Sequence, residues 1–266
     1  PREVRNQSTM MRTINQATGV APYELCDVAD IGDSFVERPF ALSEAHEEIL
    51  GVFQRVHAAG VVPIAVGGDH SISLPILRAL ASERPVGMVH IDAHCDTGDD
   101  HLGSRFHHGA PFSRAVEEGL LDPKRTVQIG IRGGINSRDQ WAFSYESGMR
   151  VIQMHEVYEM GIKAVIEEAR QVVGDGPTYL SFDIDALDPV YAPGTGTPEV
   201  GGLSSLEGQL LVRGMSGLDL IGADLVEVSP PFDPSGNTAL AGATIMFEIL
   251  CVLAEAVAAR RDGPTV

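Results

Sequence analysis

The sequence contains few cysteines and few basic residues, and each shortage excludes a class of protein. Cys26, Cys95 and Cys251 are the three cysteines among 266 residues. An odd number this small does not build a disulfide framework, so we expect a reducing compartment, the cytoplasm. Lys and Arg number 19 against 37 Asp and Glu, which gives a net charge of −18. This excess of negative charge argues against nucleic acid or an anionic membrane as a partner.

The sequence also lacks linkers, repeats and low-complexity tracts that would divide it. A length of 266 residues suits one α/β domain that buries roughly three quarters of its unfolded surface. The longest apolar run, 239–259, is long enough to span a membrane, but Glu248 and Glu255 lie within it. Because a charged side chain is costly in hydrocarbon, we interpret this run as a buried terminal helix.

Apolar runs alternate with amphipathic ones along the chain, which is typical of βα units and a parallel sheet. The expected strands are 24–31, 61–66, 86–91, 126–131, 150–154, 178–183 and 220–227. The expected helices are 43–59, 72–82, 110–118, 161–173, 204–214 and 238–260. Ser43 and Ser204 are predicted helix starts, and Ser204 forms a capping box with Glu207.

Three motifs rich in Asp and His follow expected strands. They are GGDHS (67–71), DAHCD (92–96) and SFDIDALDP (181–189). In an open α/β sheet the carboxyl ends of the strands line one crevice, so motifs that are distant in sequence are expected to meet there. Asp residues also cap helices and form turns, but three such motifs together favour a binding site.

The spacing within these motifs indicates metal ligands. In extended chain, side chains at i and i+2 point the same way, roughly 6.6 Å apart, so Asp92 and His94 can flank one metal ion. Asp183 and Asp185 repeat this spacing. Cys95 is expected to point away as a small buried side chain. Carboxylate with imidazole suits manganese, and nickel, iron or zinc are alternatives by ligand softness.

The motifs GGDHS, DAHCD, HHGAPF and SFDIDALDPVYAPGTGTP resemble the signatures of the ureohydrolase family, which contains arginase, agmatinase, guanidinobutyrase and proclavaminate amidinohydrolase. The similarity extends from Pro1 to the last helix. It implies an arginase-like fold, a three-layer α/β/α sandwich with a largely parallel central sheet. It further implies that residues 1–266 form a single ureohydrolase domain lacking its N-terminal strand and loop, and a homo-oligomer, trimer or hexamer.

The same resemblance implies two divalent metal ions, with manganese expected and nickel as the alternative. Carried over residue by residue, one ion takes His70, Asp92, Asp96 and Asp183, and the other takes Asp92, His94, Asp183 and Asp185. Asp92 and Asp183 are then the bridging carboxylates. Two divalent ions held in this way lower the pKa of a shared water and present hydroxide to an electrophilic carbon.

Two further residues match family motifs that act on the substrate. Glu227, in LVEVSP, is implied to pair with the substrate guanidinium through a fork-to-carboxylate bond. His108, in HHGAPF, is implied to give a proton to the leaving amine, and His107 is the alternative. The implied reaction is hydrolysis of a guanidino compound to urea and an amine.

The loop between Asp96 and His108 is expected to line the pocket mouth, and it resembles the loops of guanidino-acid hydrolases in its length and ending. We therefore expect a linear guanidino acid such as guanidinobutanoate. The residues that would bind its carboxylate are Arg105 and Asn136. Agmatine is the alternative, with Asp99 and Asp100 facing its ammonium group. A small substituted guanidine is the third possibility.

Two hypotheses from other classes are weighed against this one. A mononuclear zinc deacetylase would share the architecture but lacks the full set of six ligands. A non-catalytic partner subunit would usually have lost ligands, whereas this chain keeps all six together with Glu227 and His108. Metal stoichiometry and release of urea distinguish the three classes.

Overall fold

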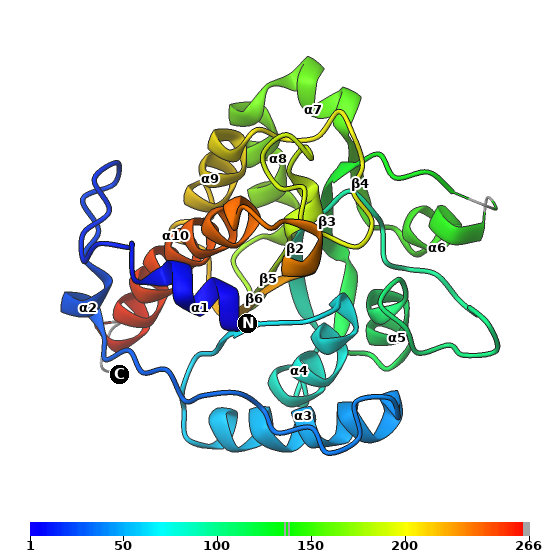
Figure 1. Cartoon of the computed structure of the whole chain (residues 1–266), viewed down its shortest axis with the longest axis horizontal. Coiled ribbons are helices and arrows are strands. Elements are labelled where there is room, and N and C mark those ends of the chain that lie inside the picture. Colours follow the sequence, from blue (N-terminus) through cyan, green and yellow to red (C-terminus); the bar gives the residue numbers. More distant parts are fainter. Residues whose placement is uncertain (136, 138, 263–266) are drawn as a thin grey trace.

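The computed structural model describes residues 1–135, 137 and 139–262, and a six-stranded parallel sheet forms its centre (Figure 1). The strands are β1 (Ile64–Val66), β2 (Val86–Ile91), β3 (Leu121–Ile131), β4 (Arg150–Gln153), β5 (Thr178–Asp183) and β6 (Leu220–Val226). Their order across the sheet is β1-β6-β5-β2-β3-β4, and every pairing is parallel. The central strands β2 and β5 are buried along their whole length, as expected for strands covered on both faces.

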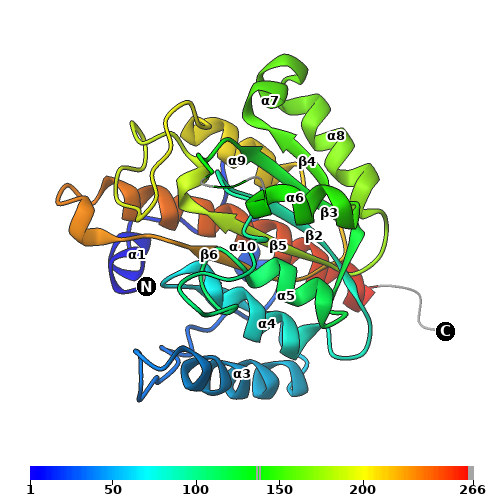
Figure 2. The same cartoon turned by 90° about the vertical axis from the view of Figure 1, so that its right-hand side faces the viewer.

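Helices cover both faces of this sheet. They are α1 (Arg2–Ser8), α2 (Pro22–Leu25), α3 (Leu42–Ala58), α4 (Ser73–Leu80), α5 (Pro111–Glu117), α6 (Asp139–Ser147), α7 (Met154–Met160), α8 (Ile162–Val173), α9 (Ser205–Arg213) and α10 (Asn237–Asp262). Helices α4 and α5 pack on one face, with α3 outside α4, while α8, α9 and α10 pack on the other (Figure 2).

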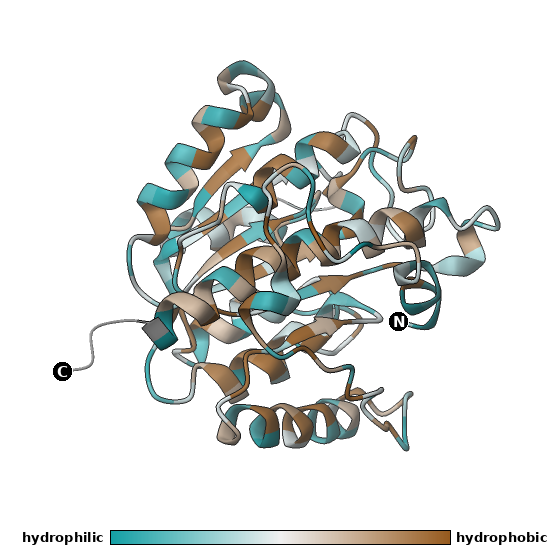
Figure 3. Cartoon of the chain, turned by 90° about the vertical axis from the view of Figure 1, so that its left-hand side faces the viewer, coloured by the Kyte–Doolittle hydropathy of each residue, from teal (hydrophilic) through white to brown (hydrophobic). Residues whose placement is uncertain are grey.

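The pleat of β2 shows why the chain builds two cores. Met88 lies in the apolar cluster with Leu77 and Phe112 of α4 and α5. Val89 and Ile91 point the opposite way and join the cluster that α8, α9 and α10 complete. Successive side chains of a strand face opposite sides, so one apolar strand serves both layers. Figure 3 shows mostly hydrophobic strands between helices that carry alternating hydrophobic and hydrophilic bands. The predicted three-layer α/β/α sandwich is confirmed.

The long helix α10 belongs to the core. Its segment Asn237–Arg261 is long and apolar enough to cross a membrane, but 61% of that window is buried inside the protein. Glu248 lies within it, 3% exposed, and pairs with Arg213 of α9 and the side-chain amide of Asn15. A buried carboxylate with these partners is typical of a helix packed in protein, so the predicted buried terminal helix is confirmed.

Two local predictions were wrong. The expected strand 24–31 is instead the end of α2 followed by chain without regular structure. Pro22 starts a short helical turn there, and the Asp30 carboxylate binds the Gly32 backbone and Arg5 rather than leaving a flat strand. Ser43 does not cap α3, which begins at Leu42 with Ala41 as its N-cap.

The second predicted helix start is confirmed. The Ser204 side chain accepts from the Glu207 backbone, and the Glu207 side chain accepts from the Ser204 backbone, which is a complete capping box for α9. The helices α1, α6 and α7, which are between seven and nine residues long, were not predicted from the sequence.

Candidate metal centre

Four neighbouring strands deliver the predicted functional residues to one edge of the sheet. His70 lies in a 3₁₀ turn after β1, Asp92 follows β2, Asp183 ends β5 and Glu227 follows β6. Because β1, β6, β5 and β2 are consecutive in the sheet and parallel, their carboxyl ends meet. These side chains therefore lie at one edge of the sheet, as predicted.

The first group of atoms surrounds His70. Its Nδ1 lies 2.9 Å from Asp96 Oδ2, 3.2 Å from Asp92 Oδ2 and 3.2 Å from Asp183 Oδ2. The His70 and Asp92 side chains are fully buried. One imidazole nitrogen thus faces three carboxylate oxygens.

The second group surrounds His94, whose Nδ1 lies 3.0 Å from Asp185 Oδ2 and 3.5 Å from Asp92 Oδ1. Asp92 therefore turns one oxygen to each group, which is the arrangement required of a bridging carboxylate. Asp183 turns Oδ2 to the first group, while its Oδ1 accepts a hydrogen bond from the Asp185 backbone at 2.8 Å. The structure brings all six predicted ligands into one connected cluster.

Uncompensated negative charge accumulates in this cluster. Burial and the neighbouring carboxylates of Asp185 and Asp92 raise the pKa of Asp183 well above its usual range. Burial and Asp92 raise the pKa of Asp185 to about 6. Burial alone would lower the pKa of His70, but three carboxylates outweigh it and raise that pKa well above its usual range. In the absence of a metal, protons thus neutralise part of the negative charge that a bound cation would otherwise neutralise.

The surroundings of the His70 ring suit a divalent cation. Within the part of the chain that the structure describes, its buried Nδ1 forms no hydrogen bond, although three carboxylate oxygens lie within 3.2 Å of it. Ser181 Oγ donates to Asp224 Oδ1 at 2.7 Å, so His70 Nε2 must donate to Ser181 Oγ at 2.8 Å. This hydrogen bond leaves the Nδ1 lone pair for a metal.

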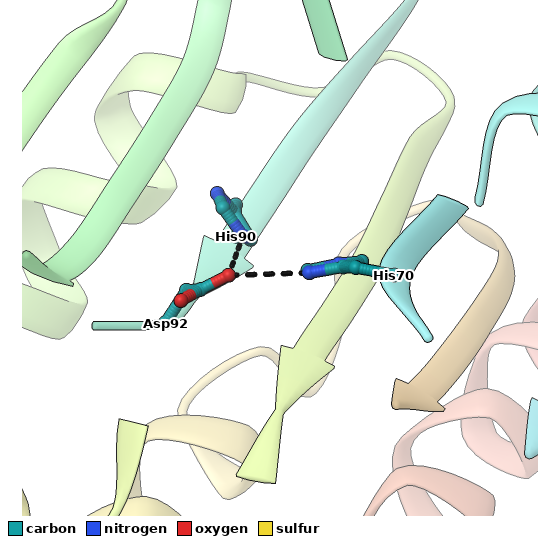
Figure 4. Close-up of side chains that lie close together, drawn as sticks. All are labelled: His70, His90 and Asp92. Carbon is teal, nitrogen blue, oxygen red and sulfur yellow. Dashed lines mark hydrogen bonds and ion pairs between the residues drawn. The ribbon is translucent and has the colours of Figure 1, made fainter. Parts of the chain in front are cut away.

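A different trio, His70, His90 and Asp92, also brings three ligand atoms close together (Figure 4). His90 Nε2, however, lies 2.7 Å from Asp92 Oδ2, which is the distance of a hydrogen bond. We therefore assign His90 to the surroundings of the ligand cluster rather than to the ligands themselves.

Two ligand-edge residues have strained backbones. Asp96 and Glu227 have backbone φ angles of 51° and 64°, in the left-handed region that residues other than glycine rarely adopt. Such conformations cost of order 1–3 kcal/mol each and concentrate at functional sites. Both residues direct carboxylates toward the cluster, which gives the strain a reason.

Glu227 is held at the rim of the cluster by its own backbone and one side-chain oxygen. Its N–H donates to Gly68 O at 2.9 Å, and its Oε1 accepts from the His70 backbone at 2.8 Å. Burial raises the pKa of Glu227 to about 7, against the hydrogen bond from His70. The carboxyl therefore changes charge close to neutral pH, which suits a group that meets a cationic substrate.

The two histidines of HHGAPF lie in different surroundings. His107 is half-buried, with Nδ1 accepting from Gly109 N and Nε2 facing Asp99 O, both at 3.2 Å. His108 is exposed, and its ring centre lies 6.0 Å from that of His107.

The predicted carboxylate-binding residues are placed in part. Arg105 forms exposed ion pairs with Asp99 at 2.7 Å and with Glu117 of α5 at 2.8 Å. Arg105 was predicted to bind the carboxylate of a guanidino acid and Asp99 the ammonium group of agmatine, and these two side chains pair with each other. Asn136 lies outside the described residues.

Sequence reasoning missed two residues beside the second group. Thr197 Oγ1 donates to Asp185 Oδ2 at 3.2 Å, and Glu199 Oε1 lies 3.7 Å from His94 Nε2. Thr197 lies within the motif that begins at Ser181, and Glu199 follows that motif directly. Their position in or next to a predicted metal-ligand motif was the available signal.

The parallel sheet and the buried cluster of carboxylates and imidazoles at its carboxyl edge define an α/β protein with a candidate site for divalent metal ions. The chain belongs to the arginase family: a family model with that description matches residues 1–252. It is accordingly a metal-dependent hydrolase that acts on a guanidino compound.

Curated relatives and solved structures agree with this family. The chain is 60% identical to guanidinopropionase from Pseudomonas aeruginosa over 259 residues, 97% of this chain and 81% of that protein. It is 49% identical to guanidinobutyrase from the same organism, over 95% of this chain and 79% of that protein. The solved proclavaminate amidinohydrolase from Streptomyces clavuligerus superposes with a TM-score of 0.92 at 36% identity, covering 96% of this chain and 85% of that one.

Proposed function

We propose that this protein hydrolyses a short linear guanidino acid to urea and an amino acid. The observation that carries the proposal is Asp92, whose two oxygens face two separate imidazole-carboxylate groups and so join two cation sites. Guanidinopropanoate and guanidinobutanoate are the substrates we favour, because relatives at 60% and 49% identity carry the corresponding names.

Two divalent cations complete the proposed site. His70, Asp92, Asp96 and Asp183 would hold one, and Asp92, His94, Asp183 and Asp185 would hold the other. Oxygen-rich ligands with two imidazoles favour manganese, with nickel as the alternative. When bound, the pair supplies Lewis acidity and a nucleophilic water at neutral pH.

Glu227 orients the substrate in this proposal. Its Oε1 already accepts from the His70 backbone, which holds the carboxylate beside the first group. A guanidinium forks onto a carboxylate through two parallel N–H bonds, which turns the guanidinium carbon toward the ligand cluster. Ionisation of Glu227, with its pKa of about 7, is favoured by the arriving positive charge.

His108 gives a proton to the leaving amine. Its neighbour His107 is engaged by the Gly109 and Asp99 backbones, which fixes that ring in the loop. His108 is exposed on the same loop, so its ring is available for a group that enters from solvent. Proton transfer by a positioned histidine contributes about 10²–10⁴ in rate.

The acid group of the substrate would meet Arg105 and Asn136. Arg105 already pairs with Asp99 and Glu117, but exposed ion pairs are weak, and a substrate carboxylate can exchange with one of them. We also infer a homo-oligomer, trimer or hexamer, located in the cytoplasm.

The test is release of urea by purified protein loaded separately with manganese and with nickel. The substrates are guanidinopropanoate, guanidinobutanoate, agmatine, arginine and a dimethylated guanidine. We expect the two guanidino acids to give the highest kcat/KM, and the Asp92→Asn variant to be the inactive control. Preference for agmatine or a dimethylated guanidine would overturn the substrate, and one metal equivalent in fully active protein would overturn the two-metal site.

A further inference from the structure

A row of polar side chains crosses the sheet directly beneath the ligands. It consists of Gln128 on β3, His90 on β2, Ser181 on β5 and Asp224 on β6. His90 is paired in register with both Gln128 and Ser181, and Ser181 with Asp224. All four residues are 0% exposed. We call these four residues the polar row.

Two members of the polar row, His90 and Ser181, lie two residues before the ligands Asp92 and Asp183. His90 precedes Asp92 by two positions, so both side chains point to the α4 and α5 face. Buried polar groups are costly unless they are hydrogen-bonded, and apolar residues would fill a sheet interior at less cost. The Ser181 and Asp224 half orients His70, as described above. The other two residues, Gln128 and His90, lead by hydrogen bonds to Asp92 instead.

The orientation of the Gln128 amide is fixed by a main-chain carbonyl. Gln128 Nε2 lies 2.6 Å from Cys95 O and 3.0 Å from His90 Nδ1. A carbonyl oxygen only accepts hydrogen bonds, so the amide nitrogen must face Cys95. Its second hydrogen then points to His90 Nδ1, which therefore acts as an acceptor.

The proton of the His90 ring must accordingly sit on the other nitrogen. Nε2 lies 2.7 Å from Asp92 Oδ2 and donates to it. The opposite oxygen, Oδ1, accepts from the His94 backbone at 2.6 Å. Both oxygens of the Asp92 carboxylate thus accept a hydrogen bond, and Oδ2 faces the His70 group while Oδ1 faces the His94 group.

We propose that Gln128 and His90 are positioning residues of the bridging carboxylate. Gln128 sets the tautomer of His90, and the Nε2–H of His90 sets the plane of Asp92 so that each oxygen faces one cation site. The inference rests on the proposed two-metal function. It assigns neither residue to substrate or to direct metal binding.

The hydrogen bonds of Gln128 also connect two parts of the site, the loop that carries His94 and Asp96 and the bridging ligand Asp92. Cys95 lies between the predicted ligands His94 and Asp96, so Gln128 anchors the ligand loop through the Cys95 carbonyl and the bridging ligand through His90. The His90 ring is packed by Phe112 of α5, with ring centres 4.5 Å apart. A substitution at Gln128 should therefore reach the metals without touching them.

The test compares four variants by manganese retention against a competing chelator. His90→Leu and Gln128→Met remove the donor or its support, and loss of such outer partners typically weakens metal affinity about 10–100-fold. His90→Gln retains an amide N–H that can reach Asp92, so it should keep most of the affinity. Thr126→Val is the matched control, because Thr126 is buried one pleat earlier on β3 and bonds Asp122 O instead.

Two further measurements separate positioning from folding. Thermal unfolding of the metal-free variants reports packing alone, where Gln128→Met and Thr126→Val should behave alike. Nitrogen-15 NMR of the imidazoles in metal-free wild type, with His90 assigned by comparison with His90→Gln, should show the His90 proton on Nε2, a bias that Gln128→Met removes.

The outcomes of these experiments are distinguishable. A His90 proton on Nδ1, or wild-type manganese affinity in His90→Leu, would overturn the positioning role even if the enzyme is active. Failure of wild-type protein to bind two manganese ions would overturn the proposed two-metal function instead.

Discussion

The substitution Glu227→Gln should separate two effects of the Glu227 charge: the destabilisation of the folded protein and the binding of the substrate. Glutamine has the shape of glutamate, and its Oε1 can still accept the hydrogen bond from the His70 backbone at 2.8 Å. The backbone bond to Gly68 O is untouched, and the residue keeps the same strained φ of 64°. The variant therefore differs from wild type in charge and little else.

The magnitude follows from the pKa of Glu227, which burial raises from the ordinary 4.5 to about 7. A carboxyl with a raised folded pKa contributes stability below its unfolded pKa, and loses that contribution as pH rises through the folded value. Each tenfold change in proton affinity is worth about 1.4 kcal/mol, so the loss between pH 4 and pH 8 is about 3 kcal/mol. Glutamine cannot ionise and does not suffer this loss.

Metal-free Glu227→Gln should therefore match wild type at pH 4 and be more stable by up to about 3 kcal/mol at pH 8. Denaturant unfolding of chelator-treated proteins at both pH values measures this difference. The metal-loaded variant should retain its metals but lose two to four orders of magnitude in kcat/KM, because breaking a buried charged pair costs about 3–5 kcal/mol.

Two results would refute this reasoning. A variant less stable than wild type at pH 8 would show that the Glu227 charge is stabilised rather than penalised by its surroundings. A kcat/KM within tenfold of wild type would show that the carboxylate does not pair with the guanidinium.

The other predictions concern metals, proton transfer and selectivity. Asp92→Asn should lower retention of both ions in elemental analysis after dialysis and His70→Asn mainly that of one, because Asp92 joins the two groups; loss of only one ion in Asp92→Asn would contradict the bridge. His108→Asn should reduce turnover about 10²–10⁴-fold with metals retained, and near-normal turnover beside an inactive His107→Asn would reassign the role. Arg105→Ala should raise KM for guanidinobutanoate roughly tenfold and leave agmatine turnover unchanged; an unaltered KM would confine Arg105 to its ion pairs.

The main strands could be predicted because a buried parallel strand is a short, unbroken apolar run. The predicted bounds 86–91 and 178–183 coincide with β2 and β5, which are covered by helices on both faces. The strand expected at 24–31 does not form, because Pro22 starts a helical turn and the Asp30 side chain binds the Gly32 backbone in a local turn. The short helix α1 depends on its contact with α10, which no local pattern shows.

The ligand cluster was visible in the sequence because its spacing is local. Residues two apart in sequence do lie together, and Asp92 and His94 approach within 3.5 Å. The reason is not the extended chain that was predicted: Ile184–Ala186 is a 3₁₀ helix, and the Asp92 carboxylate accepts from the His94 backbone, as Asp does in a turn. The contact between Gln128 and His90 depends instead on the register between β2 and β3, which is set by the whole sheet. The pairing of Arg105 with Glu117 likewise depends on where α5 lies.

The site is assembled against its own stability, and its surroundings explain why it persists. Asp96 and Glu227 occupy left-handed conformations that cost of order 1–3 kcal/mol each, a large share of the roughly 5–15 kcal/mol that stabilises a typical domain. Asp183 and Asp185 add like charges in a buried space. These strained and charged residues lie after or at the ends of β2, β5 and β6. The apolar cores on both faces of the sheet fix the backbone of these strands independently of the ligands. Divalent cations that bind only the folded chain offset the repulsion, so the same carboxylates that weaken the metal-free protein strengthen the loaded one.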